Sequence, residues 1–199
     1  MNFLAHIYLS GEFGELMLGN FIADSVKGNE MNRFSEGIQK GIRLHRNIDE
    51  FTDRHPIVEQ SKRRLRPRYS KYAGVIADIF YDHFLALHWD KYSQIPLANY
   101  AARVYAYIEP RLPELPERVN RFFPYMVKQD WLLNYARLEG IEPVLQGMSR
   151  RTTFKSDMHL AINDLRNDHA LYEQEFLLFF PELIDYAENV RNNKNFFAA

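Results

Sequence analysis

Residues 41–56 read GIRLHRNIDEFTDRHP, and this stretch decides the fold class of the chain. Apolar side chains recur in it at three- and four-residue spacing, as they do on one face of an α-helix. Extended over residues 38–54, the pattern predicts a helix with an apolar face and a charged face. The stretch also holds two ionisable residues one helical turn apart, His45 and Asp49.

Both ionisable residues are predicted to face the protein interior. At about 100° per residue with Ile38 at zero, His45 falls near 340° and Asp49 near 20°, inside the apolar arc. A carboxylate without a partner is costly to bury, so such groups are paired, hydrogen-bonded or bound to a metal. A hydrogen bond between His45 and Asp49 would satisfy both groups, so this helix alone leaves the choice open.

A second predicted helix carries another inward-facing pair. Residues 72–89, YAGVIADIFYDHFLALHW, are apolar on all sides, which is typical of a buried helix, and Asp78 and Asp82 share one stripe of it. Two carboxylates one turn apart in a buried helix repel each other unless a proton or a cation lies between them. With His6 and Asp24 as further candidate ligands, the sequence predicts a metal site built from imidazoles and carboxylates.

Helical periodicity dominates the rest of the chain, and strand-like alternation is nearly absent. Helices are predicted near residues 34–54, 72–90, 97–109, 118–138 and 156–180. The prolines in RPRY (66–69) and EPRLPELPER (109–118) are expected to interrupt helices. We therefore predict a single all-α domain over residues 1–199, a helical bundle, with residues 190–199 as a loose tail.

Composition excludes several classes of function. A formal net charge of -1 gives the chain no overall attraction to nucleic acid or to an anionic membrane. The absence of cysteine rules out disulfides, cysteine-bound zinc and thiol nucleophiles. Without a basic leader or a long apolar run, we expect neither a signal peptide nor a membrane span, and a cytoplasmic location. No P-loop, GxSxG or HExxH motif is present, so a metal-activated water is the best-supported nucleophile.

Five stretches spread in order over residues 1–151 resemble one protein family: MNFLAHIYLS, GNFIADSVKG, GIRLHRNIDEFTDRHP, DIFYDHFLALHW and VLQGMSRR. Together they resemble the acyl carrier protein phosphodiesterase family, which is regarded as a divergent, all-helical relative of the HD-type metal-dependent phosphohydrolases. Members hydrolyse the phosphodiester that joins 4'-phosphopantetheine to a serine of holo-acyl carrier protein, and they use a divalent cation, typically manganese. The resemblance therefore implies an HD-like fold and this reaction.

The resemblance also marks the polar positions inside the matched motifs: His6, Asp24, His45, Asp49, Asp78, Asp82 and His83. Among them we predict one metal ligand from each of three motifs: Asp24, His45 and Asp78. The expected cation is Mn²⁺, with Mg²⁺, Fe²⁺ and Zn²⁺ as alternatives. One departure matters, because the contiguous His-Asp pair that names the HD superfamily does not occur here. The nearest forms are His45-x-x-x-Asp49 and the reversed Asp82-His83. Superfamily order therefore does not identify the ligands.

The remaining polar positions are predicted to take part in catalysis: His6, Arg46, Asp49, Asp82 and His83. Asp49 and Asp82 would be further ligands or groups that orient the ligands. The two histidines would ligate the metal or pass a proton to the leaving oxygen. Arg46, near 80° on the helix, would clamp a phosphate oxygen or simply face solvent.

Residues 62–71, KRRLRPRYSK, carry six basic side chains and no acidic one. A solvated helix end explains such a run, and so does a protein partner. Acyl carrier proteins are small and strongly acidic, so the resemblance implies that this run docks the substrate. The predicted docking residues are Arg63, Arg64, Arg66 and Arg68. Nucleic acid is not an expected partner, because few aromatic residues are interleaved with the basic ones.

Two other functions remain open from the residues alone. An HD-type phosphohydrolase could act on a nucleotide or another small phosphodiester, and it would then work without any carrier protein. A non-catalytic helical binding module could instead use its buried Asp and His contacts to set packing specificity. Such a module would show no dependence on metal, whereas a metalloenzyme loses stability or activity in a chelator.

Overall fold

The computed structural model describes residues 1–152 and 155–193, and the regular structure in these ranges is entirely helical. The all-α prediction is confirmed. The α-helices are α1 (Phe3–Leu9), α2 (Glu15–Ile22), α3 (Glu36–Arg54), α4 (Pro56–Tyr69), α5 (Ala73–Leu87), α6 (Trp89–Tyr92), α7 (Leu97–Ile108), α8 (Glu117–Lys128), α9 (Trp131–Asn134), α10 (Leu138–Arg151), α11 (Ala161–Asn167) and α12 (His169–Asn192). Short 3₁₀ segments link them: η1 (Ala23–Ser25), η2 (Gly28–Arg33), η3 (Ser70–Tyr72), η4 (Glu109–Glu114) and η5 (Met158–Leu160).

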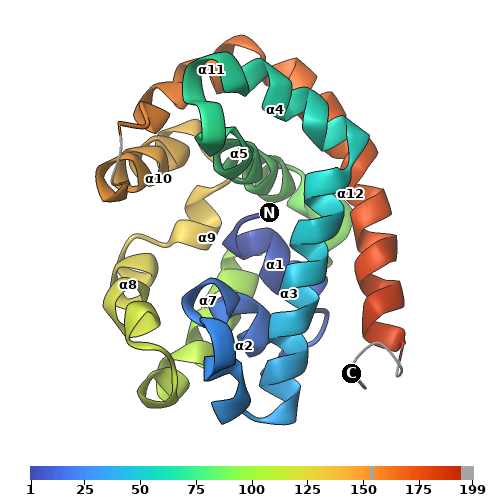
Figure 1. The fold of residues 1–199 in the computed structure, drawn as a ribbon, viewed down its shortest axis with the longest axis vertical. Coiled ribbons are helices and arrows are strands. Elements are labelled where there is room, and N and C mark those ends of the chain that lie inside the picture. Colours follow the sequence, from blue (N-terminus) through green and yellow to red (C-terminus); the bar gives the residue numbers. More distant parts are fainter. Residues whose placement is uncertain (153–154, 194–199) are drawn as a thin grey trace.

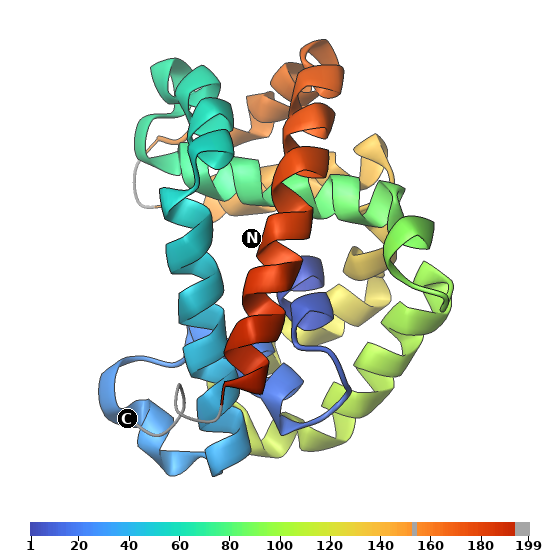
Figure 2. The same cartoon turned by 90° about the vertical axis from the view of Figure 1, so that its right-hand side faces the viewer.

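Two long helices, α3 and α12, run side by side along one side of the molecule (Figures 1 and 2). The middle helix α5 crosses behind α12, and short α1 packs inside, against α5 and α2. Figure 1 shows the N-terminus near the centre of the molecule, next to α1. The interior position of α1 is what brings His6 close to α3.

Helix α5 fills the centre of the core, as its apolar composition predicts. Phe80, Tyr81 and Phe84 are fully buried in it. Their rings pack against aromatic residues of α12, including Tyr172 and Phe176. Because the core encloses α5, polar side chains on this helix must find partners inside the protein.

Helices α2 and α3 approach unusually closely because two glycines meet at their crossing. A Cβ atom added to Gly19 would lie 2.0 Å from the main-chain oxygen of Ile38, and one added to Gly41 would lie 2.1 Å from that of Leu16. The two helix backbones therefore touch without side chains between them. This contact sets the distance between α2 and His45, which follows Gly41 by one turn of α3.

The expected helix break at residues 66–69 is wrong. Helix α4 continues through Pro67 and ends at Tyr69, and the chain turns instead at Ser70, whose φ is 49°. A proline in the last turn removes only one intrahelical hydrogen bond, so the helix tolerates it there. The α-helix before the proline-rich segment ends at Ile108 as expected, and η4 follows.

Two long segments that were each expected to be one helix are divided. Residues 118–138 split into α8 and α9 at Asp130, whose φ of 42° is left-handed, and residues 156–180 split at Asp168. In the predicted tail, α12 extends to Asn192, and residues 194–199 lie outside the described part of the chain. No helix within the described residues combines the length and apolarity needed to cross a membrane.

Candidate metal centre

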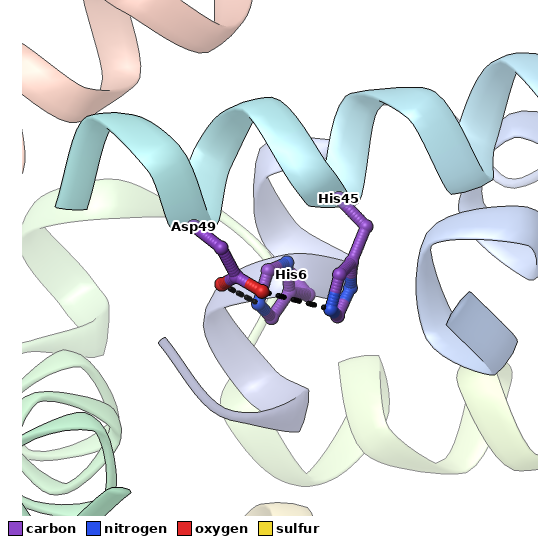
Figure 3. A group of neighbouring side chains, drawn as sticks. All are labelled: His6, His45 and Asp49. Atoms are coloured by element: carbon purple, nitrogen blue, oxygen red, sulfur yellow. Dashed lines mark ion pairs between the residues drawn. The ribbon is translucent and has the colours of Figure 1, made fainter. Parts of the chain in front are cut away.

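Helices α1 and α3 bring three predicted site residues together: His6, His45 and Asp49 (Figure 3). One donor atom from each lies within 4.8 Å of the others. His6 Nε2 is 3.2 Å from Asp49 Oδ1, and His45 Nε2 is 3.2 Å from Asp49 Oδ2. The Asp49 carboxylate therefore joins both imidazoles. We call these three residues the His–Asp group.

Asp24, from η1, adds a second carboxylate to the His–Asp group. Its Oδ1 lies 3.3 Å from His45 Nε2, so this nitrogen faces carboxylate oxygens of both Asp24 and Asp49. Burial opposes the charged form of His45, but its hydrogen bonds to these two aspartates outweigh burial and raise its pKa to about 9. The two carboxylates around Nε2 therefore stabilise a positive charge there, whether a proton or a cation.

Asn20 fixes the ring orientation of His45. The imidazole Nδ1 lies 2.9 Å from the Asn20 main-chain oxygen and 3.1 Å from its side-chain oxygen. Both partners are acceptors, so Nδ1 carries the hydrogen and Nε2 points its lone pair at the carboxylates when the ring is neutral. This is the arrangement by which a metal-ligating histidine is oriented in known metal sites.

The predicted site residues did not include Asn20. Its amide Nδ2 donates to the main-chain oxygen of His6 (2.8 Å) and to Ser10 Oγ (2.9 Å), so it ties α1 to α2 as well. The side chain is completely buried. A lone amide within the apolar run LMLGNFI is the sequence signal that could have identified it.

His6 is buried; among the described residues its Nε2 contacts only the Asp49 carboxylate, and its Nδ1 has no hydrogen-bond partner. Its ring stacks on that of His45 with centroids 3.8 Å apart. Burial is the main cause that lowers the pKa of His6 to about 4, and the positive charge of His45 is the second. A buried neutral imidazole whose Nε2 faces a carboxylate and whose Nδ1 is unpartnered is available as a metal ligand, so the donor set fits a divalent cation.

The centre is open to solvent on its carboxylate side. The side chains of His6 and His45 are 3% and 8% exposed, whereas those of Asp49 and Asp24 are 42% and 71% exposed. Asp49 thus lies at the edge of the buried face of α3 rather than within it. A substrate would approach past the two aspartates.

Arg118 lies beside this opening, and Arg46 lies three residues before Asp49 on α3, which makes Arg46 and Asp49 neighbours on the helix surface. Arg46 follows His45 directly on α3 and is exposed, as its predicted position near the edge of the apolar arc requires. Arg118 of α8 donates a hydrogen bond from Nη1 to the main-chain oxygen of Asp24 over 3.0 Å. Arg118 was missed because its place beside the site depends entirely on how α8 packs.

Asp78 lies apart from the His–Asp group, although a buried amine connects the two. The Met1 amine is 3.0 Å from Asp78 Oδ1 and 3.7 Å from Asp49 Oδ1. Burial opposes the charged form of the amine, but Asp78 and Asp49 together raise its pKa to about 10. The assignment of Asp78 as a metal ligand stays a prediction.

Asp82 accepts hydrogen bonds from the start of helix α1, a role that the sequence did not reveal. Its completely buried carboxylate accepts main-chain N–H groups at the start of α1, from Asn2 (3.2 Å), Leu4 (2.7 Å) and Ala5 (3.3 Å). These donors lack partners within α1 itself, so Asp82 caps the helix that carries His6. Its neighbour His83 turns elsewhere: Nδ1 lies 2.7 Å from the Tyr135 main-chain oxygen. Catalytic roles for Asp82 and His83 stay predictions.

The four arginines predicted to dock the carrier protein all lie on α4, and each has an acidic partner. Arg63 and Arg66 pair with Glu59. Arg64 pairs with Glu175 and stacks over Tyr172, and Arg68 pairs with Asp164. The face is therefore less basic than the run of residues 62–71 suggests. Their role in docking remains a prediction.

The fold and the site define an all-α protein with a candidate His and Asp metal centre. The model of the family described as acyl carrier protein phosphodiesterase matches residues 1–183. Curated relatives named acyl carrier protein phosphodiesterase include those of Photorhabdus laumondii (38% identical over 95% of this chain and 96% of the relative) and Yersinia enterocolitica (33% over 95% and 98%). A third, from Pectobacterium atrosepticum, is 32% identical over 94% of this chain and 98% of the relative.

The chain belongs to the acyl carrier protein phosphodiesterase family. This finding confirms the resemblance seen in the five sequence stretches. No solved structure shows significant similarity to the chain.

Proposed function

We propose that this protein is a metal-dependent phosphodiesterase that removes 4'-phosphopantetheine from holo-acyl carrier protein and releases the apo form. Membership of the family supports the substrate, because the curated relatives carry that activity in their names. The proposed metal dependence rests on one observation: donor atoms of His6, His45 and Asp49 lie close enough together to bind one cation. Neither a nucleotide substrate nor a purely structural role accounts for both findings.

His45, Asp49 and His6 would hold the cation, with Asp24 as a further oxygen donor from the open side. Mixed imidazole and carboxylate donors fit Mn²⁺, which is the cation we propose, and they also accept Mg²⁺, Fe²⁺ or Zn²⁺. When bound, such a cation supplies Lewis-acid polarisation of the phosphodiester and a nucleophile derived from water at neutral pH. His6 is proposed as a ligand rather than a proton donor, because its pKa of about 4 leaves it unprotonated at neutral pH.

The other residues would bind the phosphate of the substrate or hold the metal ligands in place. Arg46 and Arg118 beside the opening would hold non-bridging phosphate oxygens, since a guanidinium forms short charge-assisted hydrogen bonds to phosphate. Asn20 would keep His45 Nε2 aimed at the cation. Asp82 is proposed as a positioning residue that fixes α1 and therefore His6.

Mass spectrometry of holo-acyl carrier protein, incubated with this protein in chelator or in Mn²⁺, tests the proposal. We expect loss of the phosphopantetheine mass only in Mn²⁺, and none with Asp49→Asn. The matched control is Asp53→Asn on the same helix, because Asp53 is exposed and pairs with Lys62 instead. Loss of mass in chelator would exclude metal dependence. An unchanged mass with every divalent cation tried would exclude the carrier protein as substrate.

A further inference from the structure

A cavity of about 580 Å³ lies on the side of α1 that faces away from the metal centre. It is bounded by the C-terminal end of α1, the loop after it, α7 and the last turns of α12, and Tyr8 is among its lining residues. Tyr8 and His6 are separated by about 200° around α1, so the helix stands between the cavity and the His–Asp group. A volume of this size is typical of small-molecule sites.

Two arginines line the cavity, and neither forms an ion pair within residues 1–152 and 155–193. Arg103 lies over the Phe13 ring, with its guanidinium carbon 4.6 Å from the ring centroid. Arg191 lies so close to Gly11 that a Cβ there would be 1.9 Å from Nη1, and its Nε is buried without a hydrogen-bond partner. Gly11 also has a φ of +78°, so the chain bends there in a way that makes room for the guanidinium.

The remaining walls suit an apolar body. The rings of Phe13 and Tyr100 lie 5.5 Å apart, and Tyr8 completes the aromatic lining. Glu12 also lines the cavity, so with Arg103 and Arg191 its ionisable groups carry one net positive charge. A guanidinium binds phosphate or carboxylate in bidentate fashion, and aromatic walls hold a flat or aliphatic body beside it.

We infer that this cavity binds a small organic oxyanion, a phosphate or a carboxylate, carried on an aromatic or aliphatic body. The oxyanion would bind Arg191 and Arg103, and the body would pack on Phe13, Tyr100 and Tyr8. This site is separate from the metal centre and does not depend on the proposed phosphodiesterase activity.

Isothermal titration calorimetry of the full chain tests the inference, with chelator present so that no metal-bound site contributes. Phenyl phosphate and phenylacetate are the probes. Inorganic phosphate, which lacks the aromatic body, and benzyl alcohol, which lacks the oxyanion, are the comparison compounds. We expect one-to-one binding of at least one probe. We expect it to be weaker by about tenfold or more in Arg191→Gln and in Arg103→Gln, as lost charge-assisted hydrogen bonds imply. Gly11→Ala should match Arg191→Gln, because the added Cβ displaces the guanidinium.

The control is Arg111→Gln, since Arg111 also stacks on an aromatic ring, that of Tyr107, but does not line the cavity. Circular dichroism establishes that each variant is folded before titration. Tighter binding of phenyl phosphate assigns a phosphate ligand, and tighter binding of phenylacetate assigns a carboxylate. The inference is overturned if neither probe binds, if affinity is the same without Arg191 and Arg103, or if inorganic phosphate binds as tightly as phenyl phosphate.

Discussion

At the scale of single residues, the neutral side chain of Asn20 orients the ionisable side chain of His45. Asn20 presents two acceptors to His45 Nδ1 and two hydrogens to α1, all inside the core. The His45 tautomer, and with it the direction of the Nε2 lone pair, follows from these contacts. A polar residue at a buried position thus acts on the site without touching the substrate.

Asn20→Ala is expected to weaken Mn²⁺ binding by about 10-fold, because His45 Nδ1 loses its side-chain acceptor and keeps only the main-chain oxygen. Titration of Mn²⁺ followed by electron paramagnetic resonance measures the affinity. Asn47→Ala is the control, since this amide lies on the same helix but donates to the Arg43 main-chain oxygen and accepts from Tyr186, not from the site. Equal affinities in Asn20→Ala and the unmodified protein would show that His45 does not depend on this amide.

His45 should also make the stability of the metal-free protein depend on pH. Its pKa in the folded state is about 9, above the 6.5 expected when unfolded, so the folded state holds the proton more tightly. The stabilisation, on the order of 3 kcal/mol, is complete below about pH 6.5 and is lost as the pH rises through about 9. Urea unfolding in chelator between these pH values measures it. His45→Gln should reduce the slope and leave the share of the Met1 amine, whose pKa is raised from 8.0 to about 10. A slope unaffected by His45→Gln would contradict the assignment.

At the scale of helices, the contact between α2 and α3 controls the site. Gly19 and Gly41 let the two backbones touch, which places Asn20 within reach of His45. Neither glycine belongs to the predicted set of functional residues. They act through geometry alone, because any side chain at the crossing would separate the helices.

Gly41→Ala is therefore expected to destabilise the fold by about 1–3 kcal/mol or more, as overpacking in a core does, and to weaken Mn²⁺ binding as well. Gly74→Ala in α5 is the matched control, because a Cβ there meets only Lys62 Cδ at 3.9 Å. That change should be neutral or stabilising, since alanine favours a helix over glycine. Chemical denaturation of both variants compares them. Similar stabilities would refute the close-contact explanation.

At the scale of the whole molecule, the site depends on segments far apart in the chain. Asp82 of α5 holds the first turn of α1, which carries His6, and α3 supplies the other two members of the group. The opening faces solvent beside Arg46 and Arg118, whereas the predicted docking arginines lie on α4 and are paired with acids. Docking of an acidic protein would therefore depend on charges spread over more than one helix.

Arg63→Glu is expected to raise KM for the carrier protein several-fold, with kcat little changed, because long-range attraction steers the encounter. The effect should shrink as salt is added. Arg121→Glu is the control: both arginines form an i,i+4 pair with a glutamate, Arg63 with Glu59 and Arg121 with Glu117. Steady-state assays at two salt concentrations decide the matter. An unchanged KM would remove α4 from the docking surface and leave Arg46 and Arg118 as the contacts.

The sequence by itself determined the helical class, the amphipathic course of α3 and the inward direction of His45. These are local properties, because the helical period alone decides which residues share a face. The same period could not show that Asp49 would be half exposed. It also could not show that α4 would continue through Pro67, because a proline's cost depends on its place within the helix.

Only the tertiary structure decided which inward-facing groups meet. Asp82 could be read as a ligand from its own helix, yet its carboxylate is occupied by N–H groups about 80 residues earlier in the chain. His6 and Asp49 meet, and Asn20 reaches His45, because α1, α2 and α3 pack together. The physical reason is that a helical wheel fixes directions within one helix, whereas a metal centre needs distances between helices, and packing alone sets those.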